Sequence, residues 1–68
     1  MILTHDTAKT YVNAKLTEWS YKEFVIINAT TIREDHGDSV DVTFTIDNDP
    51  KHHIFTVWVQ DDKLYGEW

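Results

Sequence analysis

Residues 52–60 constrain the fold more than any other segment of the chain. They read His-His-Ile-Phe-Thr-Val-Trp-Val-Gln, a run too short for a helix and rich in the β-branched and aromatic residues that suit a pleated, half-buried surface. Side chains of a strand alternate between its two faces. The predicted core face carries Phe55, Val57 and Val59, and the predicted outer face carries Ile54, Thr56 and Trp58.

The turn that follows this strand predicts its first neighbour. If Asp61 and Asp62 form a two-residue hairpin loop, the chain from residue 63 onward pairs back on the strand. The predicted pairs are Gln60 with Lys63, Val59 with Leu64, Trp58 with Tyr65, and Phe55 with Trp68.

Residues 40–46 predict the second neighbour, because apolar and polar residues alternate there as in an antiparallel strand with one wet face. Residues 48–51 are the expected turn. The predicted pairs are Asp47 with His52, Phe44 with Phe55, Val42 with Val57, and Val40 with Val59. Both hairpins then turn the same side of the central strand inward, whereas a one-residue slip would turn the apolar side chains outward.

Residues 4–19 predict a helix, since apolar side chains recur there at intervals of three and four. Thr4 or Asp6 is placed to cap the first turn. The alternative is a twisted strand, because many residues of the segment are mediocre helix formers. The helical stripe consists of Ala8, Tyr11, Val12, Leu16 and Trp19, with Lys15 among them.

Residues 24–32 form a second strand-like run, and their register stays open. The residues turned to the core are either Phe24, Ile26 and Ile32 or Val25, Ile27 and Ala29. The choice depends on how many residues the following turn uses, with Gly37 as its expected left-handed position. The predicted fold class is α+β, with one N-terminal helix packed on a four-stranded antiparallel β-meander in a single domain, residues 1–68.

Composition makes several classes of function less favourable. Twelve carboxylates against six Lys and Arg give a formal charge of −6, which disfavours direct binding to nucleic acid or an anionic membrane and favours a protein partner with a basic surface. The chain has no cysteine and no run of about 20 apolar residues, so we expect a cytoplasmic protein that does not span a membrane. Without a readable catalytic set or glycine-rich loop, we expect no enzyme and no cofactor.

Acidic residues cluster in two of the predicted turns. In a four-stranded meander the first and third turns lie at the same end of the sheet, with neighbouring strands about 4.8 Å apart. We call these five carboxylates the acidic rim: Glu34, Asp35, Asp38, Asp61 and Asp62. They are either ordinary turn and solubility residues or a phosphate-like charge pattern that a nucleic-acid-binding surface would accept.

The outer face of the meander carries a second candidate site. Trp58 faces Tyr65 there, with Ile54 on the same strand, and Trp and Tyr often anchor protein interfaces. The cluster is either a cross-strand pair covered by the N-terminal arm, residues 1–3, or a surface for a partner or a second copy. Open edges at residues 24–32 and 63–68 offer a further route to a homodimer.

Metal binding is a weaker expectation. Neither residues 35–38 nor residues 47–49 supply the six to eight oxygens of a calcium loop. His52 and His53 are neighbours on a strand and so point to opposite faces, which makes them a poor chelate and favours structural roles.

The leading functional hypothesis is a small non-enzymatic binding module that occupies a basic, nucleic-acid-binding surface of a larger protein. In charge and size the chain is similar in type to the DNA-mimicking inhibitors that phages and mobile elements encode, although no family motif carries this similarity. The alternative hypothesis is a homodimeric structural or ligand-handling domain that associates through the outer face or an open edge.

Overall fold

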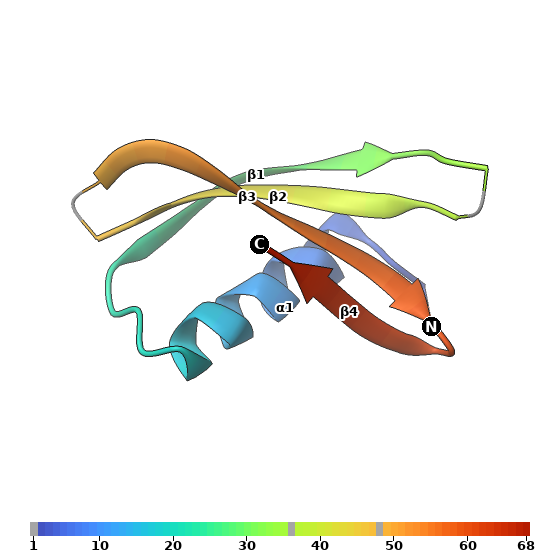
Figure 1. Cartoon of the computed structure of the whole chain (residues 1–68), viewed down its shortest axis with the longest axis horizontal. Coiled ribbons are helices and arrows are strands. Elements are labelled where there is room, and N and C mark those ends of the chain that lie inside the picture. Colours follow the sequence, from blue (N-terminus) through green and yellow to red (C-terminus); the bar gives the residue numbers. More distant parts are fainter. Residues whose placement is uncertain (1, 36, 48) are drawn as a thin grey trace.

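The computed structural model describes residues 2–35, 37–47 and 49–68. Helix α1 (His5–Glu18) is followed by four strands: β1 (Phe24–Ile32), β2 (Ser39–Ile46), β3 (Asp49–Gln60) and β4 (Lys63–Glu67). The strands form one antiparallel sheet in the order β1-β2-β3-β4, and α1 lies along one face of it (Figure 1). The predicted α+β fold with an N-terminal helix on a four-stranded meander is confirmed. Expectations that involve Met1, His36 and Asn48 lie outside the described residues.

Helix α1 begins where the sequence predicts. The Thr4 side chain accepts a hydrogen bond from the Thr7 backbone N–H at 3.0 Å, so it satisfies one of the unpaired donors of the first turn. Asp6 lies in that same turn, where a negative charge interacts favourably with the helix dipole. The predicted helix over residues 4–19 is confirmed, and the alternative of a twisted strand is wrong.

The core lies between α1 and the inner face of the sheet. The helix contributes every fourth residue, and β2 and β3 contribute every second one. The fully buried side chains are Ala8, Val12, Leu16, Val40, Val42, Phe44, Phe55 and Val57. Leu3 also packs against this core, while Ile2 is 82% exposed. The described part of the N-terminal arm therefore covers the helix side and not the outer face.

The sequence left open which residues of strand β1 face the core, and the structure shows that a β-bulge divides the strand between the two alternatives. Strand β1 pairs with β2 from Phe24 opposite Ile46 to Ile32 opposite Ser39, with an irregularity between Ile26 and Asn28. The extra residue reverses the alternation, so Phe24 and Ile26 face the core before the bulge and Ala29 faces it afterwards. Each predicted register therefore holds over part of the strand, and Val25 and Ile27 are left 62% and 41% exposed.

The turn between β2 and β3 differs from the prediction. Ile46 pairs with Asp49, so the strands already pair at residue 49 and the predicted turn over residues 48–51 is wrong. Asp47 has a φ of 50°, the left-handed conformation that a tight hairpin turn requires. Pro50 belongs to β3, where no β4 pairing reaches it; a proline without an N–H is tolerated on such an edge and beside a bulge.

This change shifts the β2–β3 pairs by two residues. Val40 faces Val57, Val42 faces Phe55 and Phe44 faces His53, where Val59, Val57 and Phe55 were expected. Two residues is the period of a strand, so the same side chains still face the core. The predicted β2–β3 pairs were therefore wrong, but the side chains predicted to face the core were right.

The β3–β4 hairpin confirms its predicted register. Gln60 pairs with Lys63, Val59 with Leu64, and Trp58 with Tyr65. The described pairs end at Thr56 and Glu67, so the predicted pair of Phe55 with Trp68 is not among them. The Trp68 ring instead contacts the rings of Phe44 and His53, with centroids 5.1 Å and 5.4 Å away.

Gly66 allows β4 to approach the core closely. A Cβ at this position would lie 2.4 Å from Phe55 Cε1 and 2.6 Å from Tyr11 Cε1, well inside van der Waals contact. Phe55 meets Tyr11 edge to face and Trp19 in a stack, with ring centroids 6.0 Å and 5.8 Å apart. The missing side chain of Gly66 is therefore a packing requirement. In the described part of the chain, no helix has the length and apolar character needed to cross a membrane.

Candidate protein-binding surface

The first and third turns lie at the same end of the sheet. Loop 33–38 joins β1 to β2, Asp61 and Asp62 join β3 to β4, and Figure 1 shows both connections on the same side of the molecule. The twist of the sheet carries the β3–β4 turn away from the plane of β1 and β2 in this view. The residues of the acidic rim therefore share one end of the molecule, although they do not form a straight row.

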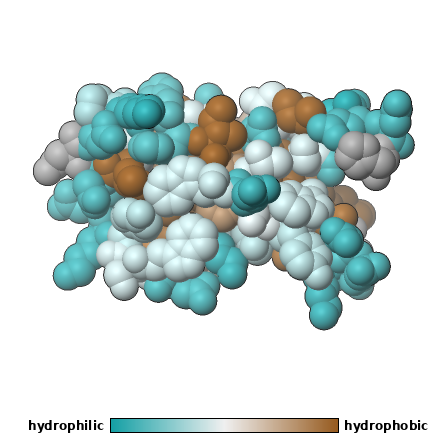
Figure 2. All heavy atoms as spheres, in the orientation of Figure 1, coloured by the Kyte–Doolittle hydropathy of each residue, from teal (hydrophilic) through white to brown (hydrophobic). Residues whose placement is uncertain are grey.

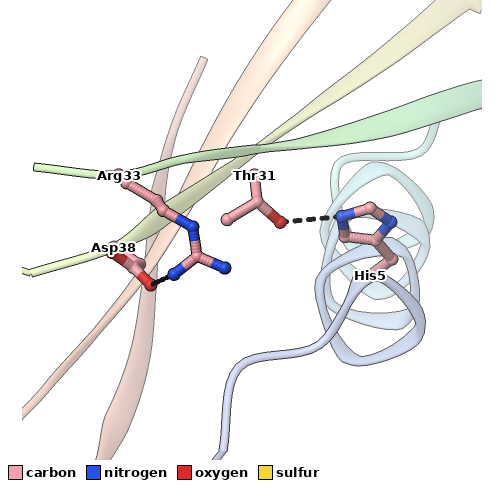
Figure 3. Close-up of polar contacts among 4 residues, drawn as sticks. All are labelled: His5, Thr31, Arg33 and Asp38. Carbon is pink, nitrogen blue, oxygen red and sulfur yellow. Dashed lines mark hydrogen bonds and ion pairs between the residues drawn. The ribbon is translucent and has the colours of Figure 1, made fainter.

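Within loop 33–38, one carboxylate of the acidic rim already has a partner. Arg33 Nη1 donates a hydrogen bond to Asp38 Oδ2 at 3.2 Å, and the pair bridges the loop (Figure 3). Arg33 leaves the sheet on the same side as Thr31, whose hydroxyl meets His5 Nε2 of α1 at 2.8 Å. The Asp38 carboxylate is thus turned toward the helix side, and Gly37 provides the left-handed position with a φ of 137°.

The β3–β4 turn places two carboxylates directly in solvent. Asp61 and Asp62 have φ values of 53° and 60°, the pair of left-handed residues that a type I′ hairpin turn requires. The pKa of Asp62 lies below its ordinary value of 3.8, first because its side chain accepts a hydrogen bond and then because a positive charge lies nearby. Asp62 is therefore ionised at neutral pH, with part of its charge offset nearby.

The outer face of the sheet carries the predicted aromatic pair. The rings of Trp58 and Tyr65 stack with centroids 6.3 Å apart and planes 19° from parallel. Ile54 lies on the same face and is 53% exposed, but it belongs to a different part of the surface. The row of Asp41, Thr56 and Glu67 crosses the sheet between Ile54 and the aromatic pair, so the structure separates Ile54 from that pair.

A hollow lies beside Trp58 at the acidic end. Its volume is about 420 Å³, within the range of small binding pockets. Loop 33–38, the start of β2 and the end of β3 form its walls. The lining residues are Glu34, Gly37, Asp38, Ser39, Thr56, Trp58, Val59 and Gln60. The hollow therefore brings together parts of two surfaces that were predicted separately: Glu34 and Asp38 of the acidic rim, and Trp58 of the outer aromatic pair.

Two further carboxylates lie on the outer face. Asp41 accepts a hydrogen bond from the Thr56 hydroxyl at 2.8 Å, and Glu67 pairs with Thr56 from the other side. The sequence analysis did not assign either of them to a site. The period of two could have indicated both, because Asp41 alternates with Val40 and Val42, and Glu67 shares its face with Tyr65.

Hydropathy is mixed on the side of the molecule shown in Figure 2. Brown apolar areas are separated there by teal and pale side chains, so this side has no single large apolar patch. Continuous apolar patches of several hundred square ångströms are the usual mark of a greasy interface. The side of the molecule shown in Figure 2 therefore lacks this mark.

The described histidines belong to no group of potential metal ligands. His53 is packed between the rings of Phe44 and Trp68. Its Nε2 lies 3.7 Å from Asp49 Oδ2 and is buried without a hydrogen-bond partner among the described residues. In residues 2–35, 37–47 and 49–68, no three His, Asp or Glu side chains converge as metal ligands would.

Comparisons with family models, with curated proteins and with solved structures find no match to this chain.

Proposed function

We propose that this protein is a small non-enzymatic binding module whose acidic end occupies a basic, nucleic-acid-binding surface of a larger cytoplasmic protein, in the manner of the inhibitors of phages and mobile elements. One observation carries the proposal. The hollow beside Trp58 joins the acidic loop 33–38 to an aromatic residue at the end where Asp61 and Asp62 also lie.

Electrostatics supports a basic partner. Two strand spacings, about 10 Å, are the least separation of the two turns, and the twist of the sheet adds to it. This exceeds the Debye length of about 8 Å at physiological salt, so the carboxylates of the two turns reinforce each other most at lower salt. The net charge of −6 adds long-range attraction and speeds the encounter.

Local cations reduce the negative potential of the acidic rim without cancelling it. Arg33 pairs with Asp38, and Lys63 follows Asp62 directly in the chain. The five carboxylates of the acidic rim thus outnumber these two basic side chains.

The test is a charge-matched pair of variants. In the first, Asp35, Asp38, Asp61 and Asp62 are replaced by Asn, a residue that tolerates the left-handed positions of the turns. The control replaces Glu18 and Glu23 by Gln, and Asp47 and Asp49 by Asn. Both variants lose four negative charges, but the control loses them from the end of α1, the approach to β1 and the β2–β3 turn.

The measurement is binding to the partner captured from host extract, over a range of salt concentrations and with double-stranded DNA as competitor. We expect the rim variant to bind at least tenfold more weakly with a flatter salt dependence, and DNA to displace the wild-type protein. Equal losses in both variants would show that only net charge matters. Unchanged affinity of the rim variant would reject the proposed function.

A homodimer is the second candidate function, and the uncovered outer face with its Trp58–Tyr65 stack favours it. The edges favour it less, because β1 carries a bulge and β4 is short, features that discourage edge pairing. Sedimentation at high protein concentration tests it. A dimer that Trp58→Ala dissociates would support this candidate, and a strict monomer would exclude it.

A further inference from the structure

We propose that the hollow beside Trp58 receives an arginine side chain of the protein partner, with the guanidinium plane against the indole ring. This inference rests on the proposed function, because it names the group through which a basic partner is recognised. It also gives the outer face a role in binding, which the attraction between the acidic rim and a basic partner does not require.

Trp58 lines this hollow, whereas its stacking partner Tyr65 does not. The indole ring stacks on Tyr65 of β4, whereas the other walls of the hollow come from loop 33–38 and from Ser39 at the start of β2. Trp58 therefore stands between Tyr65 and the hollow. The stack also holds the indole in place before binding, so little rotamer entropy is lost when a ligand arrives.

The carboxylates in and near the hollow favour a positively charged occupant. Glu34 lines the hollow, and Asp41 and Glu67 occupy the neighbouring row of the same face. Diagonal positions on adjacent strands are about 7–8 Å apart, within reach of a long side chain. An occupant of the hollow that carries positive charge thus meets an aromatic ring and several carboxylates at once.

Arginine fits these features better than lysine. Its guanidinium is planar, stacks on aromatic rings and donates hydrogen bonds in two directions, whereas an ammonium is compact and strongly hydrated. Tryptophan is the strongest cation–π partner among the aromatic side chains. The polar groups of Ser39 and Gln60 border the hollow and are available to the remaining guanidinium donors.

The experiment compares two capped peptides of equal length and charge, one with four arginines and one with four lysines spaced by glycine and serine. Dissociation constants are measured by titration calorimetry for the wild-type protein, Trp58→Leu and Trp58→Phe. Trp19→Phe is the matched aromatic control, because Trp19 is exposed beside Phe55 and Trp68, away from the hollow.

The wild-type protein is expected to bind the arginine peptide about 3- to 30-fold more tightly than the lysine peptide. Trp58→Leu should abolish this preference, Trp58→Phe should restore part of it, and Trp19→Phe should leave it unchanged. In the wild-type spectrum, the indole N–H signal of Trp58 should shift with the arginine peptide. That shift reports on the site even if a Trp58 variant is unstable.

The remaining outcomes separate the two proposals. Equal affinity for both peptides, falling with salt, overturns the arginine site and leaves the basic-surface function standing. An arginine preference that Trp58→Leu does not alter, or that leaves the Trp58 signal in place, also overturns the site. No binding of either peptide at low salt contradicts both proposals.

Discussion

The two faces of the sheet are built from the same strands and differ in what covers them. On the face beneath α1, β2 and β3 place Val40, Val42, Phe44, Phe55 and Val57, all fully buried. On the other face the intervening residues are threonines, carboxylates and a stacked Trp58–Tyr65 pair. The comparison teaches that the buried core lies entirely on the covered face, whereas no helix or strand of the described chain packs over the open face.

Neighbouring residues of β3 give the sharpest way to break this comparison. Phe55→Ala should destabilise the protein by about 3–5 kcal/mol, because it empties a volume that Tyr11 and Trp19 cannot refill. A domain of 68 residues has a total free energy of unfolding of about 3–10 kcal/mol, so this variant should lose a large share of its stability. Urea denaturation followed by circular dichroism measures the loss.

The control for Phe55→Ala is Ile54→Ala. Ile54 is half exposed on the open face, and its truncation should cost less than about 1 kcal/mol. Similar losses for these two variants would mean that the two faces contribute equally to stability.

Gly66→Ala should have the next largest effect, about 1–3 kcal/mol. The added methyl group would collide with the rings of Phe55 and Tyr11, and β4 would have to move away from the core. Thermal unfolding compares this variant with Glu67→Ala at the adjacent exposed position. If Gly66→Ala is as stable as the wild-type protein, β4 does not pack as closely as described.

Thr56→Val sharpens the comparison on the open face, with an expected loss of about 0.5–1.5 kcal/mol. The substitution keeps the shape of the side chain but removes the hydroxyl that donates to Asp41. Thr43→Val, on the same face of β2, is the control, and urea denaturation is again the measurement. Equal effects of the two substitutions would show that the Thr56–Asp41 hydrogen bond adds no net stability.

The smallest effect is expected from Ile27→Thr, within about 0.5 kcal/mol of the wild-type protein. Ile27 lies at the β1 bulge and is exposed, while its neighbour Ile26 packs against the core. Ile26→Thr should therefore destabilise clearly more than Ile27→Thr in the same denaturation experiment. The opposite order would contradict the bulge and restore an unbroken alternation along β1.

The hairpins show how far prediction from the sequence could go. The Asp61–Asp62 turn was predicted with its register, because two residues suited to left-handed conformations stood between alternating strands. The other hairpin was assigned a turn over residues 48–51, which shifted the predicted pairs by two residues, since Pro50 resembled a turn residue and in fact lies on an unpaired edge of β3. The faces were still right, because the error equalled the strand period.

For the candidate site, the sequence predicted the residues and part of their arrangement. Trp58 and Tyr65 were predicted to face each other, and the acidic turns were predicted to share one end of the sheet. The sequence could not indicate that Asp38 turns toward Arg33 on the helix side. Nor could it indicate that Glu34 and Trp58 border one hollow, because loop conformation and sheet twist decide both.

The sequence by itself determined the helix, the number and order of the strands, and the face on which each β2 and β3 side chain lies. These features follow from local periodicity and turn chemistry, which act between residues close together in the chain. Only the tertiary structure decided the β1 bulge, the close approach at Gly66 and the union of acidic loop and aromatic pair. These features depend on how segments that are far apart in the sequence pack against one another. Such packing produces no periodic pattern of residues that could be recognised in the sequence.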